Sequence, residues 1–331
     1  MPNDTAWIDA HLDLAYLAGE GRDFLTSTRK AGLDATVSWP DLAAARIHTA
    51  FATIFTERDG PADEPAAYPA DDADAAEAAG LRQLEWYEAE ERAGRVRIVR
   101  NGSDLDHETL PRLVILMECA DPITGPDAVE AWYRRGLRIV GLSWARGSRY
   151  AGGNAVPGGL TPAGDAIVDA FEAHGIAHDV SHLSEAAFDD VLERSQGPVC
   201  ATHSNAAAIT GRNPRHLRDD QIEAIAARDG VIGLNLFGQF LHGEDRDATI
   251  EDCLDHVEHV ASIAGRERVG LGSDADGGFP GSALPTGLRD LRNLDRLTEG
   301  LADRGWSAAA CDGFQSRNWR RWLDRLLTSC R

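Results

Sequence analysis

Short apolar runs rich in β-branched residues alternate along the chain with longer stretches of helical periodicity. Runs of this length, bounded by polar or turn residues, are typical of buried strands. The eight predicted strands are Trp7–Leu12, Ile47–Phe55, Leu113–Met117, Arg138–Leu142, Ile176–Val180, Val199–Thr202, Val231–Leu236 and Val269–Gly272. The predicted helices lie near Ala70–Ala93, Asp127–Arg135, Pro162–His174, Glu185–Ser195, Asp219–Arg228, Ile250–Ala264 and Pro285–Arg304.

The alternation of strands and helices predicts an α/β fold with a parallel sheet. Eight strands favour closure of that sheet into a (β/α)8 TIM-like barrel of the metal-dependent hydrolase type. An open doubly wound sheet is the alternative, but it usually carries a phosphate-binding turn, and no GxGxxG motif follows a predicted strand. Because barrels of this length are common, we predict a single barrel domain over residues 1–331.

The net charge and the cysteine content indicate which classes of binding partner and which cellular compartment are expected. The formal net charge is −21, which argues against nucleic acid and anionic membrane as partners. The five cysteines form no CxxC pair, so the sequence favours neither a disulfide framework nor a thiolate zinc site, and a reducing, cytoplasmic location is predicted. The N-terminal segment has neither the basic nor the apolar part of a signal peptide, and no apolar stretch is long enough to span a membrane.

Candidate chemistry gathers at the ends of the predicted strands, where barrel enzymes place their active residues. Five strands end in a histidine or carboxylate, and these residues are His11, Asp13, Glu118, His182, His203 and Asp274. Each signal alone is also explained by a solvated strand end, a rim carboxylate or a turn aspartate before glycine. Their coincidence at five strand ends predicts a metal site built from imidazoles and carboxylates.

Two of these strand ends carry further information. His11 and Asp13 are two residues apart on one strand, so both side chains point to the same face and can share a metal ion. Glu118 follows five apolar residues, where an unpaired carboxylate is costly to bury. Lys30, the only lysine, lies in a polar N-terminal segment, so Glu118 is a better candidate for a metal bridge than a carbamylated lysine.

Neighbouring polar residues are assigned supporting roles. His178 shares a face with His182 but lies deeper, which predicts a core or supporting residue rather than a ligand. Asp179 points to the other face and is expected to hold nearby backbone, and Asp276 fits a turn residue before glycines. No GxSxG motif surrounds a serine, which argues against a serine nucleophile.

Several segments resemble the membrane (renal) dipeptidase family of zinc peptidases. The opening DAHLDL is similar to the family's DGHNDL, and VGLGSDADGG is similar to its VGIGSDFDG. The stretch GLTPAGDAIVDAFEAHGIAHDVSHLSEAAFDDVLERSQGPVCATHSNA, continued by NPRHLRDDQIEAIAARDGVIGLN, resembles the central part of the family almost without interruption. The similarity runs from about Ile8 to QSRNWRRWL, and the long central match is more specific than any single motif.

This resemblance implies a binuclear site with two Zn2+ ions per chain. Carried over by motif, His11 and Asp13 would hold one zinc, His182 and His203 the other, Glu118 would bridge them, and Asp274 would shuttle the proton. Arg215, in PRHLRDD, stands where the family has an arginine that binds the substrate carboxylate. This loop is one residue longer than usual, so Arg212 is a second candidate for the same role.

The implied activity is hydrolysis of small dipeptides by a metal-bridging hydroxide, with D-residues accepted at the C-terminal position. Another amide, N-acyl amino acid or lactone hydrolase on the same scaffold is the alternative, because a fold does not determine a substrate. The family's LTH motif supplies a histidine for the oxyanion, whereas GLSW places Trp144 in this substrate-binding region. Arg146, Arg149 or Asn154 could supply substitute contacts, and Cys119-Ala120 replaces the two glycines that usually follow the bridging glutamate.

The predicted partner is a small peptide-like substrate, with no nucleic acid and no membrane, and a homodimer stays open. The segment Trp319–Trp322 fits either a dimer contact or a helix packed against the barrel, and the second interpretation is favoured. A binding protein without catalysis is disfavoured, because such a protein has no need for the complete set of metal ligands.

Overall fold

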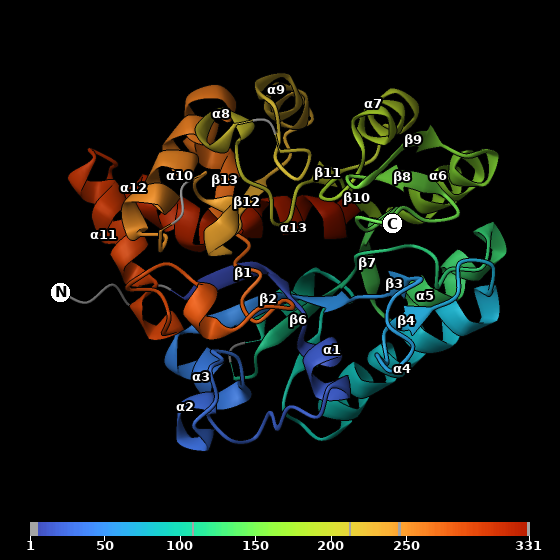
Figure 1. The fold of residues 1–331 in the computed structure, drawn as a ribbon, viewed down its shortest axis with the longest axis horizontal. Helices are drawn as coiled ribbons and strands as arrows, with labels where there is room; N and C mark the ends of the chain where they lie inside the picture. The colour runs from blue at the N-terminus through green and yellow to red at the C-terminus, as the bar shows by residue number, and fades with distance from the viewer. Residues whose placement is uncertain (1–5, 108, 212, 244–245, 330–331) are drawn as a thin grey trace. The chain divides into compact units, whose positions relative to one another are not determined.

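The computed structural model describes residues 6–107, 109–211, 213–243 and 246–329 (Figure 1). The chain divides into two compact units. Unit 1 comprises Met1–Asp13, Asp23–Ala50 and Ala201–Trp322, and unit 2 comprises Leu14–Arg22, Phe51–Cys200 and Leu323–Arg331. The single domain over residues 1–331 stays a prediction.

Unit 1 contains a group of parallel strands. In the order of pairing these are β1 (Trp7–Leu12), β13 (Val269–Leu271) and β12 (Ile232–Leu234). Ala201 forms a further parallel bridge with Ile232. The strand β2 (Ile47–Ile54) begins in unit 1, where the Trp7 N–H donates to the Arg46 carbonyl at 2.8 Å. β1 is buried along its whole length, as expected for a parallel strand covered on both faces.

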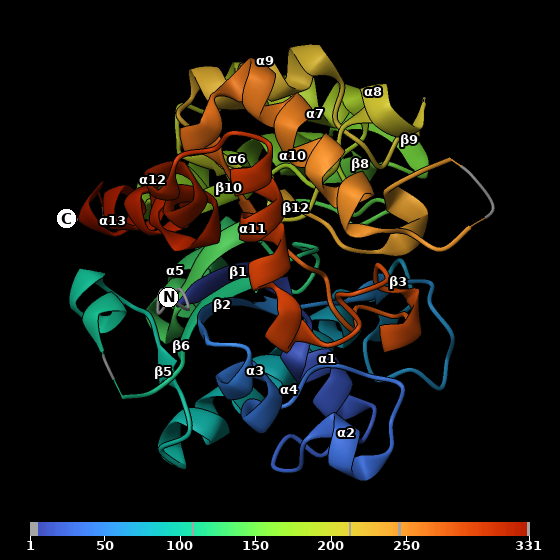
Figure 2. The same cartoon turned by 90° about the vertical axis from the view of Figure 1, so that its left-hand side faces the viewer.

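The helices of unit 1 follow these strands along the chain. They are α2 (Thr28–Ala31), α3 (Trp39–Ala44), α8 (Ala207–Thr210), α9 (Asp219–Ala227), α10 (Ile250–Ala264), α11 (Asp295–Asp303), α12 (Ala308–Asp312) and the beginning of α13 (Asn318–Ser329), as far as Trp322. α10 begins with a capping box, because Thr249 and Asp252 each accept the other's backbone N–H. Figure 2 shows α11 packed against both α10 and α12.

Unit 2 contains a second group of parallel strands. In the order of pairing these are β11 (Val199–Cys200), β10 (Ala177–Asp179), β7 (Leu137–Gly141), β6 (Arg112–Met117) and β5 (Arg97–Ile98). The end of β2 lies beside β6, because the Glu118 N–H donates to the Ile54 carbonyl at 3.0 Å. Two small pairs complete the strands: β3 (Glu57–Arg58) with β4 (Ala67–Tyr68), and the antiparallel β8 (Ala151–Gly153) with β9 (Val156–Leu160).

The helices of unit 2 are α1 (Leu14–Gly19), α4 (Ala73–Arg92), α5 (Val129–Arg135), α6 (Pro162–His174) and α7 (Glu185–Arg194). α6 has the predicted bounds because its ends are marked in the sequence. Thr161 accepts the Gly164 N–H, Pro162 opens the first turn, and Gly175 ends the helix at φ 68°.

One predicted helix is wrong in its first half. Only Asp295–Asp303 of the predicted Pro285–Arg304 is α-helical. Gly287 adopts φ 97°, and the Asp290 side chain accepts the Arg292 N–H to start a separate short turn. A left-handed glycine stops a right-handed helix from running through this segment.

The C-terminal tryptophans resolve one alternative left by the sequence. Trp319 and Trp322 are both buried, and the Trp319 indole N–H donates to the Leu271 carbonyl at 3.0 Å. Packing of this helix onto the strands of unit 1 is therefore confirmed, while the oligomeric state stays a prediction.

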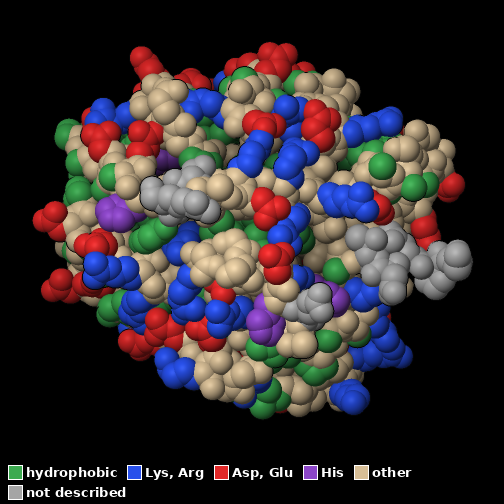
Figure 3. Space-filling view, turned by 180° about the vertical axis from the view of Figure 1, so that it is seen from behind, with side chains coloured by type: hydrophobic (Ala, Val, Ile, Leu, Met, Phe, Trp, Pro, Cys, Tyr) green, Lys and Arg blue, Asp and Glu red, His purple; other side chains and the backbone are tan. Residues whose placement is uncertain are grey.

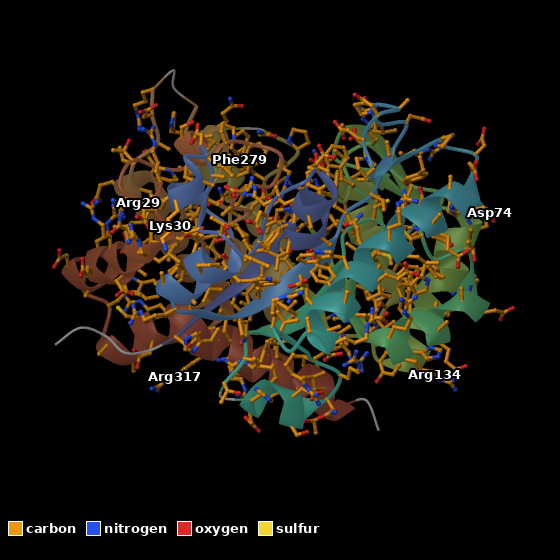
Figure 4. All side chains as sticks on the ribbon, turned by 90° about the horizontal axis from the view of Figure 1, so that it is seen from below. Arg29, Lys30, Asp74, Arg134, Phe279 and Arg317 are labelled. Atoms are coloured by element: carbon orange, nitrogen blue, oxygen red, sulfur yellow. The ribbon has the colours of Figure 1, made fainter. Side chains whose placement is uncertain are left out.

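The surface agrees with a charged chain. Arginine and acidic side chains are interspersed over the face seen in Figure 3. None of the described helices combines the length and the apolar character that crossing a lipid bilayer needs. Lys30 is exposed on α2 beside Arg29 (Figure 4), a position that agrees with the prediction that it is not a metal bridge.

Candidate metal centre

Four of the predicted site residues come together within unit 1. His11 lies on β1, Asp13 and Asp274 follow β1 and β13, and His203 follows the Ala201 bridge. Potential ligand atoms of His11, His203 and Asp274 all lie within 4.8 Å of one another. His11 Nε2 is 3.9 Å from Asp13 Oδ2, and the imidazole rings of His11 and His203 stack with their centroids 3.5 Å apart. The strands thus gather the imidazoles and carboxylates as predicted.

Burial determines the protonation states of His11, Asp13 and Asp274. It lowers the pKa of His11 well below the ordinary value, and the Arg215 charge lowers it further, so the imidazole is neutral. Burial raises the pKa of Asp13 to about 7. Burial, followed by the neighbouring Asp13 carboxylate, raises the pKa of Asp274 well above the ordinary value. Without a cation, the group therefore disfavours two ionised carboxylates.

The same group satisfies the requirements of a divalent ion. Asp13 Oδ1 is buried, and no described residue gives it a hydrogen bond. A dication would supply this oxygen with a partner and would hold both carboxylates ionised. Neutral imidazoles with carboxylates are a common donor set for Zn2+ and for neighbouring transition metals. The residues present therefore fit a metal ion.

Asp274 is held by an asparagine that the sequence did not identify. The Asn235 side-chain amide donates to Asp274 Oδ2 at 2.9 Å, and the Asp274 backbone N–H donates to the His11 carbonyl at 3.2 Å. Asp274 adopts φ 58°, a left-handed conformation that aspartate tolerates better than most residues. The available signal was a polar residue soon after the apolar run of β12.

Two aspartates near this group anchor backbone. Asp9, on β1, accepts the Ser273 N–H at 2.8 Å and the Ser273 hydroxyl at 2.5 Å. Asp276 accepts the N–H groups of Thr36 and Val37 at 2.9–3.0 Å and the Thr36 hydroxyl at 3.0 Å. Asp276 does adopt a turn conformation at φ 62°, but its hydrogen bonds to residues 36 and 37 could not be predicted from the sequence.

Arg215 lies beside His203 and is buried. Its guanidinium donates to the Ser204 hydroxyl at 3.0 Å and to the His203 carbonyl at 2.6 Å. The guanidinium carbon also lies 5.6 Å from the centre of the Phe240 ring. Arg215 therefore supports the backbone that carries His203, and its role in binding a substrate carboxylate stays a prediction. Arg212 lies outside the described residues.

The other predicted ligands come together within unit 2. Glu118, directly after β6, and His182, three residues after β10, are both largely buried, and Glu118 Oε1 is 2.9 Å from His182 Nε2. His182 Nδ1 lies 3.1 Å from Asn154 Oδ1. The Trp144 ring is tilted against the His182 ring at a centroid distance of 5.9 Å. Trp144 therefore lies beside a predicted ligand, and its role in binding the substrate stays a prediction.

Asn154 orients His182 from two sides. Its backbone N–H donates to the His182 carbonyl at 2.7 Å, and its Oδ1 can accept only from an Nδ1–H. This hydrogen bond selects the tautomer that leaves Nε2 to coordinate a metal. Of the three substitutes considered for the missing histidine, Arg149 is instead paired with the buried Asp121 at 3.1 Å.

The Asn154→Ala variant is expected to bind metal ions roughly 10-fold more weakly, because His182 loses the acceptor that fixes its tautomer. The Asn154→Asp variant restores an acceptor and should bind at least as tightly as the parent chain. Competition with a coloured chelator measures both affinities. Equal affinities for the alanine and parent proteins would show that Asn154 does not orient the ligand.

The remaining polar residues take the predicted supporting roles. His178 is buried and packs against Phe171 with ring centroids 5.9 Å apart, as a core residue does. Asp179 accepts the Ser181 N–H at 3.0 Å and so holds nearby backbone.

Comparisons with known proteins identify the family of this chain. The sequence pattern of the membrane dipeptidase family, peptidase family M19, matches residues 2–326. An uncharacterized protein of Klebsiella pneumoniae is 32% identical over 249 residues, which cover 71% of this chain and 90% of that protein. Dipeptidase aclJ of Aspergillus oryzae is 32% identical over 197 residues, which cover 58% of this chain and 46% of that protein.

Solved structures extend the comparison over nearly the whole chain. A dipeptidase of family M19 is 27% identical, with a TM-score of 0.85 over 98% of this chain and 99% of that chain. A metallopeptidase from Rhodobacter sphaeroides, bound to a phosphinate mimic of the dipeptide L-Ala-D-Ala, is also 27% identical. Its TM-score is 0.83 over 98% of this chain and 100% of that chain.

These matches define the class of the protein. The fold is an α/β barrel of eight parallel strands, the metal-dependent hydrolase type that the sequence predicted. The chain belongs to the membrane dipeptidase family and is a metallodipeptidase, a hydrolase that acts on peptide bonds.

Proposed function

We propose that this enzyme uses two zinc ions to hydrolyse small dipeptides, including dipeptides with a D-residue at the C-terminal position. The observation that carries the proposal is the gathering of His11, His203 and Asp274 with their ligand atoms within 4.8 Å in a metallodipeptidase chain. The extension to D-residues is supported by the L-Ala-D-Ala mimic bound to the Rhodobacter sphaeroides relative.

The proposal divides the ligands as the family resemblance implies. His11 and Asp13 would hold one ion, His182 and His203 would hold the other, and Glu118 would be shared by both. Bound zinc would polarise the scissile carbonyl and lower the pKa of a bound water toward about 7. The buried, neutral His11 is ready to donate its lone pair without first losing a proton.

The chain's own groups then handle the substrate and the proton. Asp274, held by Asn235, takes the proton of the attacking water and returns it to the leaving amine. Arg215 would bind the C-terminal carboxylate of the dipeptide, because a guanidinium matches a carboxylate through two parallel hydrogen bonds. Trp144, beside His182, forms part of the wall that faces the substrate.

Removal of the metal should abolish dipeptide cleavage, and zinc should restore it. The experiment measures metal per chain in the purified protein and compares cleavage of L-Ala-L-Ala with that of L-Ala-D-Ala before and after dialysis against a chelator. We expect about two metal ions per chain and chelator-sensitive cleavage of both substrates. Chains that bind no metal after reconstitution, or that cleave equally well without it, would refute the proposal.

A second candidate function rests on Trp144. Its indole occupies half-buried space between Phe55, at a centroid distance of 5.3 Å, and His182. An indole N–H donates one hydrogen bond but carries no charge, so it stabilises an oxyanion less than a histidine can. The alternative substrates are N-acyl amino acids, other amides and lactones. Two bound metals with cleavage of these compounds, but not of dipeptides, would favour this alternative.

We also propose that the enzyme acts in the cytoplasm. Cys119, Cys200, Cys253 and Cys311 are buried free thiols, which suit a reducing compartment. Fractionation of the source cells followed by detection of the protein with an antibody would test this location.

A further inference from the structure

One hydroxyl group contacts two of the predicted zinc ligands. Thr202 Oγ1 lies 3.2 Å from His11 Nδ1 and 2.9 Å from His203 Nδ1. The Thr202 side chain is fully buried, as is that of His11, so water does not compete for these hydrogen bonds. His11 and Thr202 are 191 positions apart in the sequence, so this contact is a product of the fold.

The hydrogen-bonding capacity of a hydroxyl limits how the two rings can be protonated. A threonine hydroxyl can accept two hydrogen bonds and donate one. Both histidines can bind metal through Nε2 only when both Nδ1 atoms carry the proton and donate to Oγ1. If the hydroxyl donated to one ring instead, that ring would carry its proton on Nε2 and could not coordinate there.

The backbone of Thr202 is closely packed between neighbouring strands. A Cβ atom added at Gly233 would lie 1.9 Å from the Thr202 carbonyl oxygen, and one added at Gly272 would lie 1.7 Å from it. The strands therefore approach Thr202 as closely as glycine permits. The neighbouring Ser204 N–H donates to the Gly233 carbonyl at 2.9 Å, which anchors the segment on the other side of His203.

We propose that Thr202 is a positioning residue that holds His11 and His203 together in the tautomer that leaves both Nε2 atoms to the metal ions. This inference rests on the proposed zinc site. One hydroxyl thereby aligns a ligand of each proposed ion, and the stacking of the two rings at 3.5 Å follows from their shared hydrogen-bond acceptor. The hydroxyl, rather than the volume of the threonine, is the part that acts.

The test separates the hydroxyl from the side-chain volume. Thr202→Val keeps the shape but removes the acceptor, and we expect zinc affinity to fall about 10- to 100-fold. Thr202→Ser keeps the hydroxyl and should bind zinc as the parent chain does. Thr53→Val is the matched control, because Thr53 is equally buried and its hydroxyl has no hydrogen-bond partner among the described residues. Chelator competition measures all four affinities, and the Co2+ absorption spectrum reports ligand geometry.

A second measurement covers the case in which Thr202→Val does not fold. In the zinc-loaded parent labelled with 15N-histidine, NMR should show two protected Nδ1–H protons whose signals shift in Thr202→Ser. Parent-like zinc affinity in a folded Thr202→Val variant, or protons on Nε2 of these rings, would overturn the proposal. Failure of the dipeptidase proposal looks different, because the parent chain itself would then fail to bind zinc or to cleave dipeptides.

Discussion

The Asp274→Asn variant is expected to bind metal ions normally and to hydrolyse dipeptides about 10²- to 10⁴-fold more slowly than the parent chain, the range typical of a lost general acid–base. An asparagine has nearly the same shape, and its amide oxygen can still accept the hydrogen bond from Asn235. It also tolerates the left-handed backbone at φ 58°. The change thus removes the proton-carrying group and leaves its surroundings in place.

The expected loss lies in kcat, because Asp274 moves a proton and is not proposed to bind the substrate. Steady-state kinetics with L-Ala-D-Ala, combined with metal analysis, measure both quantities. Asp59→Asn is the matched control. Asp59 also has a left-handed backbone, at φ 52°, but it is exposed, and its carboxylate accepts a hydrogen bond from the Ala70 N–H. An unchanged kcat would exclude Asp274 as the proton carrier, and loss of metal would show that it acts as a ligand instead.

The Gly272→Ala variant should lose both stability and metal binding. Its Cβ would be placed 1.7 Å from the Thr202 carbonyl oxygen and 3.4 Å from the His203 Cα. Because the closest atom belongs to the backbone, the strand that carries His203 must move away. Overpacking of this kind costs about 1–3 kcal/mol of unfolding free energy, and more where backbone has to shift. Zinc affinity should fall as well, because His203 moves with Thr202.

Urea unfolding and chelator competition measure the two effects separately. Gly102→Ala is the control, since no described atom lies within 4 Å of a Cβ added there and its φ is not left-handed. Its unfolding free energy should change by about 0.5 kcal/mol or less. Normal zinc affinity in the Gly272→Ala variant would mean that the close approach of these strands does not position His203.

The order of the elements could be predicted because strands and helices differ in length and periodicity. β1, α6 and α10 have the predicted bounds, and α10 in addition has a capping box at its start. Short helices such as α2 and α12, with four and five residues, leave too few positions to show a period of 3.6. The predicted helix Pro285–Arg304 is wrong in its first half, where Gly287 adopts a left-handed backbone at φ 97°.

The candidate ligands were visible because each is a polar residue that ends an apolar run. Their supporting residues were not visible, because side-chain hydrogen bonds between distant segments depend on the finished fold. In the sequence, Thr202 looks like an ordinary strand residue. Only the folded structure shows that its hydroxyl lies 3.2 Å from His11 Nδ1. Asn154 was considered only as a substrate contact, and its bond to His182 depends on the turn between β8 and β9.

The hydrogen bonds from Thr36 and Val37 to Asp276 limit which segments of this enzyme can be exchanged with those of its relatives. The segment that follows Asp274 and the segment around residue 36 are 240 positions apart, yet they share one set of hydrogen bonds. A chimaera that imports the first segment without the second would bury a carboxylate whose donors had been left behind. For grafting or directed evolution, these two stretches of chain are therefore a single exchangeable part.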